Sequence, residues 1–302
     1  MKKLILSVLS LVFVLTACSN SAKNESSKSQ KQYVLDSGKK IKVPKQPKRI
    51  VVIADTYAGG VKYLGGHIVG VNKDVEQSDI LKGKFSKVKK IDPENVEKIT
   101  KLKPDLIIAD TDDKNLKKFN KITTTIPMKY GKRNYLETQI QLGKLLGKEK
   151  QAQKWVNDWK QQTSKDAKEI HEHIGNKASV SIFDDFDKEY YAFGKSWGRG
   201  GEILYQSFNL RMPEALEKAV GKDGYKALSL EAMPKYAGDY IITMSEGKSS
   251  PEFEKTNVWK NIPSVKQGNV IHVKAENYWY NDPYSLETNR KNLKSHLINM
   301  AK

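Results

Sequence analysis

Short apolar runs alternate with segments of helical spacing along the first half of the chain. Residues 49–54 (RIVVIA) and 105–109 (DLIIA) are almost wholly apolar, which is the pattern of strands buried on both faces. The segments of helical spacing lie at residues 57–64, 95–102 and 115–122. Strands that alternate with helices predict an α/β lobe with a mainly parallel sheet over residues 32–147.

The middle of the chain has a different period. Residues 148–174 contain neither Gly nor Pro, and their apolar or small side chains, Trp155 and Trp159 among them, recur at steps of three or four. A helix of this length is roughly 40 Å long at ~1.5 Å per residue, and Gly175 is a suitable terminator. We therefore expect residues 148–175 to form a rigid helix that connects two lobes. A long surface helix within a single domain is the alternative.

The last part of the chain repeats the rhythm of the first. Asp282 and Pro283 are residue types preferred at the N-cap and the first position of a helix. The predicted fold is therefore α/β, with a second lobe over residues 176–302 joined to the first by one long helix. In this lobe we expect strands at residues 180–183, 190–193, 239–243 and 270–273, and helices at residues 200–208, 228–235 and 283–300.

One internal match relates the two lobes. Glu97 precedes Asp105 by eight residues, and Glu231 precedes Asp239 by the same interval. Both stretches read as a helix, a turn and a strand that begins Asp-(Leu/Tyr)-Ile-Ile. Most helical glutamates only face solvent, but this matched placement favours a shared docking role for Glu97 and Glu231.

The N-terminus has the pattern of an export signal. Two lysines precede the apolar residues 4–17, a run too short for a stable transmembrane helix. The run ends in Leu-Thr-Ala-Cys18, which resembles the lipobox of bacterial lipoproteins, where the cysteine thiol receives a diacylglycerol. We expect a signal peptide at residues 1–17 and a polar, flexible tether at residues 18–31, beginning at lipidated Cys18. This places the protein on the outer face of the cytoplasmic membrane, and a plain secretory signal is the alternative.

The chain is strongly basic. It carries 53 Lys and Arg against 35 Asp and Glu, a net charge of +18. The lysines are spread along the whole chain and no nucleic-acid motif accompanies them, so we expect no nucleic-acid partner. A basic surface suits an exported protein that lies against anionic lipid and cell-wall polymers.

Metal binding and catalysis find little support in the sequence. The five histidines are scattered, and His171 and His173, two apart on a helix, point in different directions. Neither a G-x-S-x-G elbow nor an HExxH zinc motif is present. We therefore expect no directly bound metal or cofactor and no enzymatic activity, with an exported hydrolase as a distant alternative.

A glycine-rich stretch at residues 194–201 (GKSWGRGG) is the strongest candidate for a ligand-binding wall. Trp197 and Arg199 are two apart, so an extended backbone would present both side chains to the same side. The glycines let the backbone approach a ligand closely. The alternatives are a phosphate-cradling loop, whose Gly-Lys-(Ser/Thr) ending is absent, and a structural turn with Trp197 in the core.

With these features the chain resembles the substrate-binding lipoproteins of ABC importers for iron–siderophore complexes. More narrowly, it resembles the FhuD-type ferric-hydroxamate (ferrichrome) binding proteins of Gram-positive bacteria. The resemblance implies a monomer with a helical backbone between its lobes, a ligand in the inter-lobe cleft, and contacts of Glu97 and Glu231 with arginines of an ABC permease. It rests on the stretches PKRIVVIADTYAGGVKYLG, EKITKLKPDLIIAD, SIFDDFDKEYYAFGKSWGRGGEILYQSF, KYAGDYIITMSEG and YWYNDPYSL.

A ferric trihydroxamate needs little from a protein beyond a shaped wall. Its three bidentate hydroxamates fill the positions around Fe³⁺ and cancel its charge, so the site needs aromatic surfaces and a few donors. Arg199 offers a rigid fork of donors for the hydroxamate oxygens. Besides Trp197, the candidate aromatic residues are Tyr191, Tyr130, Tyr57 and Phe85, together with Tyr278, Trp279 and Tyr280, of which the resemblance favours Tyr280 first.

A carboxylate siderophore or haem in the same fold is the alternative ligand. An anionic carboxylate complex would need several inward Arg or Lys side chains, and haem would need an axial Tyr, His or Met. One clear cleft arginine among aromatic residues favours the neutral hydroxamate.

Overall fold

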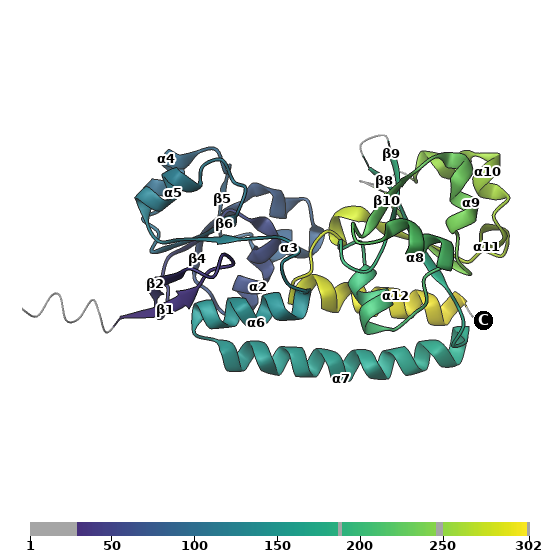
Figure 1. Cartoon of the computed structure of the whole chain (residues 1–302), viewed down its shortest axis with the longest axis horizontal. Helices are drawn as coiled ribbons and strands as arrows, with labels where there is room; N and C mark the ends of the chain where they lie inside the picture. The colour runs from purple at the N-terminus through teal and green to yellow at the C-terminus, as the bar shows by residue number, and fades with distance from the viewer. Residues whose placement is uncertain (1–28, 187–188, 246–249, 301–302) are drawn as a thin grey trace, which may run out of the picture.

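A computed structural model describes residues 29–186, 189–245 and 250–300 of the chain. Two α/β lobes lie side by side, and helix α7 (Glu149–Ile174) runs along both of them (Figure 1). The predicted fold class and the long connecting helix are confirmed. The predicted signal peptide, Cys18 and the tether as far as residue 28 lie outside the described residues. In the described part, no helix is long and apolar enough to cross a bilayer.

The N-terminal lobe is built on a five-stranded sheet of order β5-β4-β3-β6-β7. Every pairing in it is parallel, as the apolar runs predicted, because both faces of such a sheet are covered. The strands are β3 (Ile50–Val52), β4 (Ile68–Asn72), β5 (Lys89–Ile91), β6 (Leu106–Asp110) and β7 (Thr125–Met128).

Helices cover both faces of this sheet. Val51 and Val52, neighbours on β3, pack into different cores because adjacent strand residues point to opposite faces. The core around Val52 includes helices α2 (Ala58–Tyr63) and α6 (Tyr135–Leu146). The core around Val51 includes helices α4 (Val96–Lys101) and α5 (Leu116–Ile122). The lobe is completed by 3-10 turns at Asp55–Tyr57 and Lys73–Glu76, α3 (Asp79–Lys84), and an antiparallel hairpin of β1 (Gln30–Val34) and β2 (Lys40–Pro44), which includes the last two residues of the predicted tether.

Helix α6 is not among the elements that the hydrophobic pattern predicts, yet local signals mark both of its ends. Asn134 and Glu137 form a capping box, in which each side chain bonds the backbone N–H of the other residue. Gly147 ends the helix in the left-handed conformation at φ 69°. An Asn-x-x-Glu sequence before a Leu-rich stretch is therefore the signal that would have revealed this helix.

The C-terminal lobe repeats this plan only in part. Its sheet has the order β10-β9-β8-β11-β12, in which β8, β11 and β12 are parallel while β9 and β10 are antiparallel to their neighbours. The predicted helix at residues 200–208 is a π-helix at Glu202–Ser207. The strands are β8 (Val180–Phe186), β9 (Glu189–Phe193), β10 (Tyr225–Leu228), β11 (Tyr240–Ser245) and β12 (Val270–Lys274), and the α-helices are α8 (Glu214–Val220), α9 (Met233–Tyr236), α10 (Asn257–Lys260), α11 (Pro263–Lys266) and α12 (Pro283–Met300).

The chain bridges the lobes a second time just before α12. The Oδ1 atom of Asn277 accepts a hydrogen bond from the backbone N–H of Asp79 at 2.9 Å, and Lys274 pairs with Asp79 at 2.7 Å. Asp282 is buried against α2, where a Cβ on Gly59 would lie 2.2 Å from its carboxyl carbon. Two connections, α7 and residues 274–282, therefore hold the lobes together.

A buried ion network fastens α12 to α7. Arg290 on α12 pairs with Asp166 on α7, and these residues are only 4% and 1% exposed. The Nζ atom of Lys294 lies 2.9 Å from Asp166 and 2.5 Å from Glu169. Since a charge left alone in such a place is costly, the network fixes how the two helices lie against each other.

Replacing Arg290 with Met is expected to lower the free energy of unfolding by about 3 kcal/mol, because the buried Asp166 would lose one of its two cationic partners on α12 and keep only Lys294. Urea unfolding measures the effect. Lys291→Met is the matched control, since the Lys291 side chain on the same helix is 68% exposed, and its change should stay below about 1 kcal/mol. Equal losses in the two variants would contradict a structural role for the buried pair.

Candidate functional site

A cavity of about 390 Å³ lies between the two lobes. The N-terminal lobe lines it with Thr56, Tyr57 and residues 129–135, and the C-terminal lobe lines it with Glu202 and Trp279 among others. Tyr57 follows β3 and residues 129–135 follow β7, so both belong to the carboxyl edge of the parallel sheet. That edge is where α/β folds usually bind ligands.

An aromatic surface of the C-terminal lobe flanks this cavity. The ring of Tyr225 lies 5.2 Å from that of Trp197 and 6.1 Å from that of Tyr191, measured between centroids. Phe193 continues the cluster at 6.4 Å from Tyr225. Tyr130 of the N-terminal lobe approaches Trp197 at 5.8 Å, so the walls of the two lobes meet through aromatic rings.

Arg199 is held among these rings. Its guanidinium carbon lies 5.0 Å from the ring centroid of Phe193, 5.7 Å from that of Trp279 and 5.8 Å from that of Phe186. Its Nε donates a hydrogen bond of 3.0 Å to Asp184, whose side chain is fully buried. Burial raises the pKa of Asp184, and the charge of Arg199 opposes that shift. The result is a fixed group of donors beside the cavity.

The glycine-rich stretch forms a tight turn rather than an extended strand. The φ angles at residues 198, 199 and 200 are 72°, 55° and 84°, so the expected extended backbone between Trp197 and Arg199 is wrong. The two side chains reach the same aromatic surface by this turn instead. The chain folds so closely that a Cβ on Gly201 would lie 2.0 Å from the carbonyl oxygen of Gly194. A positive φ is costly for arginine, which is consistent with a functional demand on Arg199.

Glu202 is a candidate that the sequence reasoning missed. It is 3% exposed and lines the cavity. Its Oε1 atom accepts hydrogen bonds from the backbone N–H of Gly198 at 3.0 Å and from Asn281 at 2.9 Å. Burial raises the pKa of Glu202 to about 7, so a ligand can meet it in either protonation state near neutral pH. Its only signal in the sequence is its place directly after the glycine-rich stretch.

The raised pKa of Glu202 predicts a pH dependence of stability. The folded protein holds this proton up to about pH 7, whereas the unfolded chain releases it near the ordinary value of 4.5. Its contribution to folding is therefore complete below pH 4.5 and is lost as the pH rises through about 7. Between those values the wild type should lose about 3 kcal/mol relative to Glu202→Gln, which carries no titrating group. Urea unfolding at several pH values tests this, and parallel curves for the two proteins would contradict it.

Three buried polar atoms on the cavity wall have no hydrogen-bond partner among the described residues. They are Oε2 of Glu202, Nε1 of Trp279 and Oγ1 of Thr56. Buried polar groups are normally paired, so such atoms on a cavity wall suit a ligand with hydrogen-bonding groups of its own. Within residues 29–186, 189–245 and 250–300, no group of three or more His, Cys, Asp or Glu residues could hold a metal ion. The cavity wall therefore offers aromatic rings and unpaired hydrogen-bonding atoms to a ligand.

Comparisons with known proteins agree with this geometry. Residues 50–277 match the family model described as periplasmic binding protein. The iron(3+)-hydroxamate-binding protein FhuD of Bacillus subtilis is 37% identical over 92% of this chain and 91% of its own length. This chain belongs to the FhuD-like periplasmic binding proteins.

Solved structures place the FhuD-like chain in the same group. The FhuD protein from S. pseudintermedius has a TM-score of 0.85 and 48% identity, over 90% of this chain and 99% of that one. FhuD2 from Staphylococcus aureus with bound ferrioxamine B has a TM-score of 0.83 and 50% identity, over 85% of this chain and 100% of that one. The family is one of transporter binding proteins rather than enzymes, which removes the hydrolase alternative.

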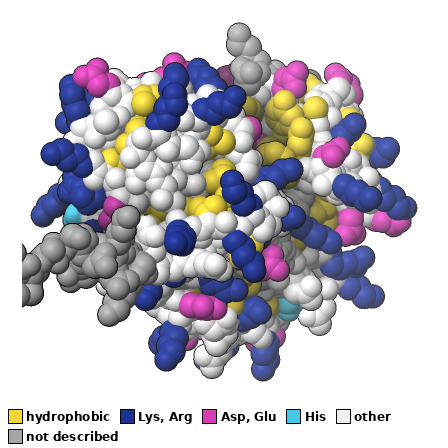
Figure 2. Space-filling view, turned by 60° about the vertical axis from the view of Figure 1, so that its left-hand side comes forward, with side chains coloured by type: hydrophobic (Ala, Val, Ile, Leu, Met, Phe, Trp, Pro, Cys, Tyr) yellow, Lys and Arg dark blue, Asp and Glu magenta, His cyan; other side chains and the backbone are white. Residues whose placement is uncertain are grey.

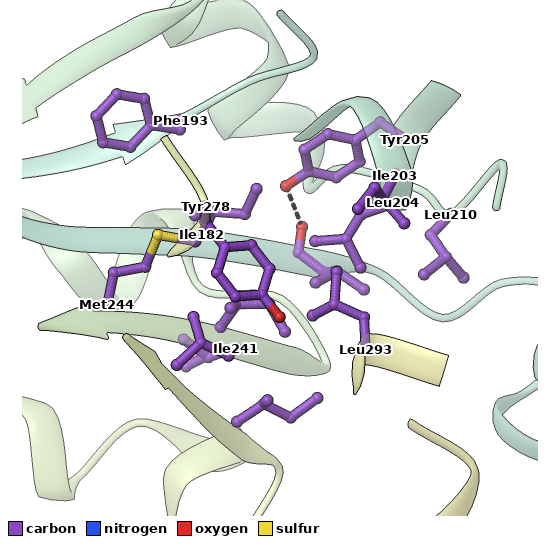
Figure 3. Close-up of a cluster of buried hydrophobic side chains, with 14 of the residues drawn as sticks. Ile182, Phe193, Ile203, Leu204, Tyr205, Leu210, Ile241, Met244, Tyr278 and Leu293 are labelled. Atoms are coloured by element: carbon purple, nitrogen blue, oxygen red, sulfur yellow. Dashed lines mark hydrogen bonds between the residues drawn. The ribbon is translucent and has the colours of Figure 1, made fainter. Parts of the chain in front are cut away.

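In the FhuD-like protein the Tyr-Trp-Tyr segment has three different environments. Trp279 lines the cavity, whereas Tyr280 is buried in the N-terminal lobe and donates a hydrogen bond of 2.9 Å to Asp55. The role of Tyr280 at the ligand stays a prediction, and in this structure its hydroxyl attaches the segment to that lobe. Tyr278 is buried in the C-terminal lobe. Figure 3 shows it in the same cluster as Ile182, Ile241, Met244 and Leu293.

The other predicted ligand residues fall into two groups. Tyr57 and Tyr130 line the cavity, and Tyr191 and Trp197 lie on the aromatic surface beside it. Phe85 does not reach the site, because its ring is fully buried in the core of the N-terminal lobe. Both lobes thus line the cavity of the FhuD-like protein, and fewer aromatic residues reach it than the sequence predicts.

The two matched glutamates occupy equivalent, exposed positions of the FhuD-like fold. The side chain of Glu97 is 77% exposed and pairs with Lys101 at 2.6 Å, and Glu231 is also exposed. The strands that follow them, β6 and β11, each lie beside the first strand of their own sheet. The aspartates also match, since Asp105 accepts two backbone hydrogen bonds just before β3, and Asp239 accepts one just before β8. The internal match in the sequence therefore has a structural counterpart.

Proposed function

We propose that this FhuD-like protein captures iron(III)–hydroxamate siderophores of the ferrichrome and ferrioxamine type between its lobes. The observation that carries the proposal is the Arg199 guanidinium, held by Asp184 among aromatic rings beside the cavity. A neutral ferric trihydroxamate presents oxygen atoms with partial negative charge and apolar linkers around them. Arg199 would donate to the oxygens while the rings pack against the linkers.

The remaining polar groups of the cavity have roles in the same proposal. Hydroxamate siderophores carry amide groups in their backbones, and these need both donors and acceptors. Trp279 Nε1 would donate to an amide oxygen, and Glu202 would accept from an amide N–H. Iron enters as cargo inside its ligand, so the protein supplies no metal ligand of its own.

We further propose that the protein works beside the membrane as the receptor of an ABC importer. Lipid on Cys18 would hold the monomeric body near the outer face of the cytoplasmic membrane. Glu97 and Glu231 would then meet arginines of the permease, one from each lobe. Their exposure and their equivalent places before β6 and β11 support this role.

Tryptophan fluorescence tests the choice of ligand, since two of the five tryptophans, Trp197 and Trp279, lie at the site. Titration of the mature protein with ferrioxamine B or ferrichrome should quench its emission, with a Kd of about 1 μM or below. Ferric citrate and haem are titrated in parallel. No quenching by either hydroxamate below about 10 μM would overturn the proposal.

One observation keeps a carboxylate siderophore as the second candidate. Lys129 and Lys132 line the cavity, as do Arg133 and Lys195. Of these, Arg133 is paired with Asp36 and Lys195 with an exposed glutamate. Two lysines on one loop could meet an anionic complex, so tighter binding of ferric citrate than of ferrioxamine B would favour this candidate.

A further inference from the structure

A large groove lies at the root of the predicted tether, away from the siderophore cavity. Its volume is about 920 Å³. Strand β1, helix α6 and the first turn of α7 form its walls. The charged side chains that line it are Lys31, Lys144, Lys148, Lys150 and a single carboxylate, Glu149.

The groove has an excess of positive charge at short range. The Nζ atom of Lys31 on β1 donates a hydrogen bond of 2.6 Å to the backbone carbonyl of Lys144 on α6, so the Lys31 side chain crosses the groove. Burial lowers the pKa of Lys31, so a bound anion would offset the energetic cost of keeping this side chain charged. Glu149 lies 4.0 Å from Lys144 and offsets only part of the charge. The N-terminal end of the 26-residue helix α7, which has no side-chain cap from Lys148, adds a positive dipole end.

The adjoining hairpin extends this basic surface. Residues 29–48 contain six lysines and one acidic residue, Asp36, which is itself paired with Arg133. Lys and Arg side chains are spread over the visible face in Figure 2, with Asp and Glu side chains among them. This hairpin is not the only basic stretch, since residues 114–136 contain seven Lys and Arg and no acidic residue. The assignment of the groove therefore rests on its place at the tether root as well as on its charge.

The position of the groove on the chain indicates what covers it. The described chain begins at Ser29, eleven residues after Cys18. Even fully extended, such a segment spans at most about 40 Å. A body held by lipid at Cys18 would thus keep its tether root within about 40 Å of the bilayer, where anionic headgroups attract lysines at about 1 kcal/mol each.

We propose that this groove binds the anionic phospholipid headgroups of the membrane that carries the anchor. The orienting role rests on the lipid anchor of the proposed function, but the binding itself does not require the anchor. Helices α6 and α4 cover opposite faces of the N-terminal sheet, so the groove and Glu97 cannot both face one flat membrane. Binding at the groove therefore defines a resting orientation that the receptor must leave when Glu97 meets the permease.

Vesicle co-sedimentation of the mature chain carrying Cys18→Ser tests the proposal without the lipid. The protein should pellet with vesicles containing phosphatidylglycerol, should not pellet with phosphatidylcholine alone, and should be released as NaCl rises from about 0.05 M to about 0.5 M. Changing Lys31, Lys144, Lys148 and Lys150 together to Gln should weaken this binding at least tenfold. The matched control changes four exposed lysines of the C-terminal lobe to Gln, namely Lys177, Lys222, Lys260 and Lys266.

Each result has one meaning. Unchanged binding in the groove variant, or equal loss in the control variant, overturns the groove as the site. Soluble poly(glycerol phosphate) is added as a competitor. If it abolishes vesicle binding at a phosphate concentration below that of the vesicles, the groove binds a phosphate polymer rather than membrane headgroups, and the proposal is overturned. Ferrioxamine B quenching is recorded for every variant, so a failed siderophore proposal is seen separately from a failed groove proposal.

Discussion

Replacing Arg199 with Gln is expected to weaken ferrioxamine B binding about a thousandfold, or about 4 kcal/mol. The change removes the guanidinium that Asp184 and the rings of Phe193 and Trp279 hold in place. Gln is shorter and uncharged, so it cannot present a fork of donors to the hydroxamate oxygens. Fluorescence titration measures the effect, and binding within tenfold of the wild type would contradict the role given to Arg199.

Two further variants separate binding from folding at this position. Arg199→Lys keeps the charge but loses the planar fork, so it should recover only part of the affinity. Asp184→Asn keeps an oxygen acceptor for Arg199 and should weaken binding far less, by about tenfold. Burial already raises the pKa of Asp184. In Arg199→Gln that carboxyl should therefore take up a proton, which limits the loss of stability that urea unfolding would record.

Replacing Glu97 and Glu231 together with Ala is expected to stop siderophore uptake while binding stays unchanged. Both side chains are exposed, and neither lines the inter-lobe cavity, so the ligand should not sense their loss. The permease would lose one ionic contact with each lobe, and two such contacts act together when both lobes must dock at once. Uptake of radioactive iron as ferrioxamine B by cells that carry only this receptor measures the effect.

The control for this variant removes two exposed glutamates elsewhere. Glu172 on α7 and Glu214 on α8 have exposed side chains, and the double change to Ala alters the net charge equally. Uptake should then remain near the wild-type rate. An equal loss of uptake in both double variants would show that the change in net charge causes the effect. Loss of siderophore binding in the Glu97 and Glu231 variant would place these residues in the cleft.

Most of the fold could be predicted from periodicity because its core strands and long helix have strong patterns. Examples are the buried runs at β3 and β6 and the helical spacing of apolar residues along α7. The antiparallel pairing of β8 with β9 could not be predicted, since a short apolar run does not indicate whether the neighbouring strand is parallel or antiparallel. The segment at residues 200–208 was predicted as a helix, but hydrophobic spacing does not distinguish its rare π form from an α-helix.

The site was predicted less completely than the fold, and the reason is geometric. Trp197 and Arg199 were predicted at the ligand because a glycine-rich stretch is conspicuous, yet the turn that brings them to one aromatic surface has three positive φ angles in a row. Alternation along a strand suggested that one or two of the three aromatic residues at 278–280 reach the ligand, but not which. The hydroxyl of Tyr280 bonds to Asp55, a partner that lies 225 residues away in the sequence and that no local pattern indicates. Nothing in the sequence around Glu202 indicates that its side chain is buried.

The double connection between the lobes has a consequence for transport kinetics. With α7 and residues 274–282 both in place, the lobes cannot separate far, and the spacing between Glu97 and Glu231 should be nearly the same with and without cargo. An empty receptor should then occupy the permease almost as well as a loaded one. Empty receptor acts in that case as a competitive inhibitor of delivery, so uptake at a fixed, limiting siderophore concentration should pass through a maximum as the amount of receptor in the cell is raised.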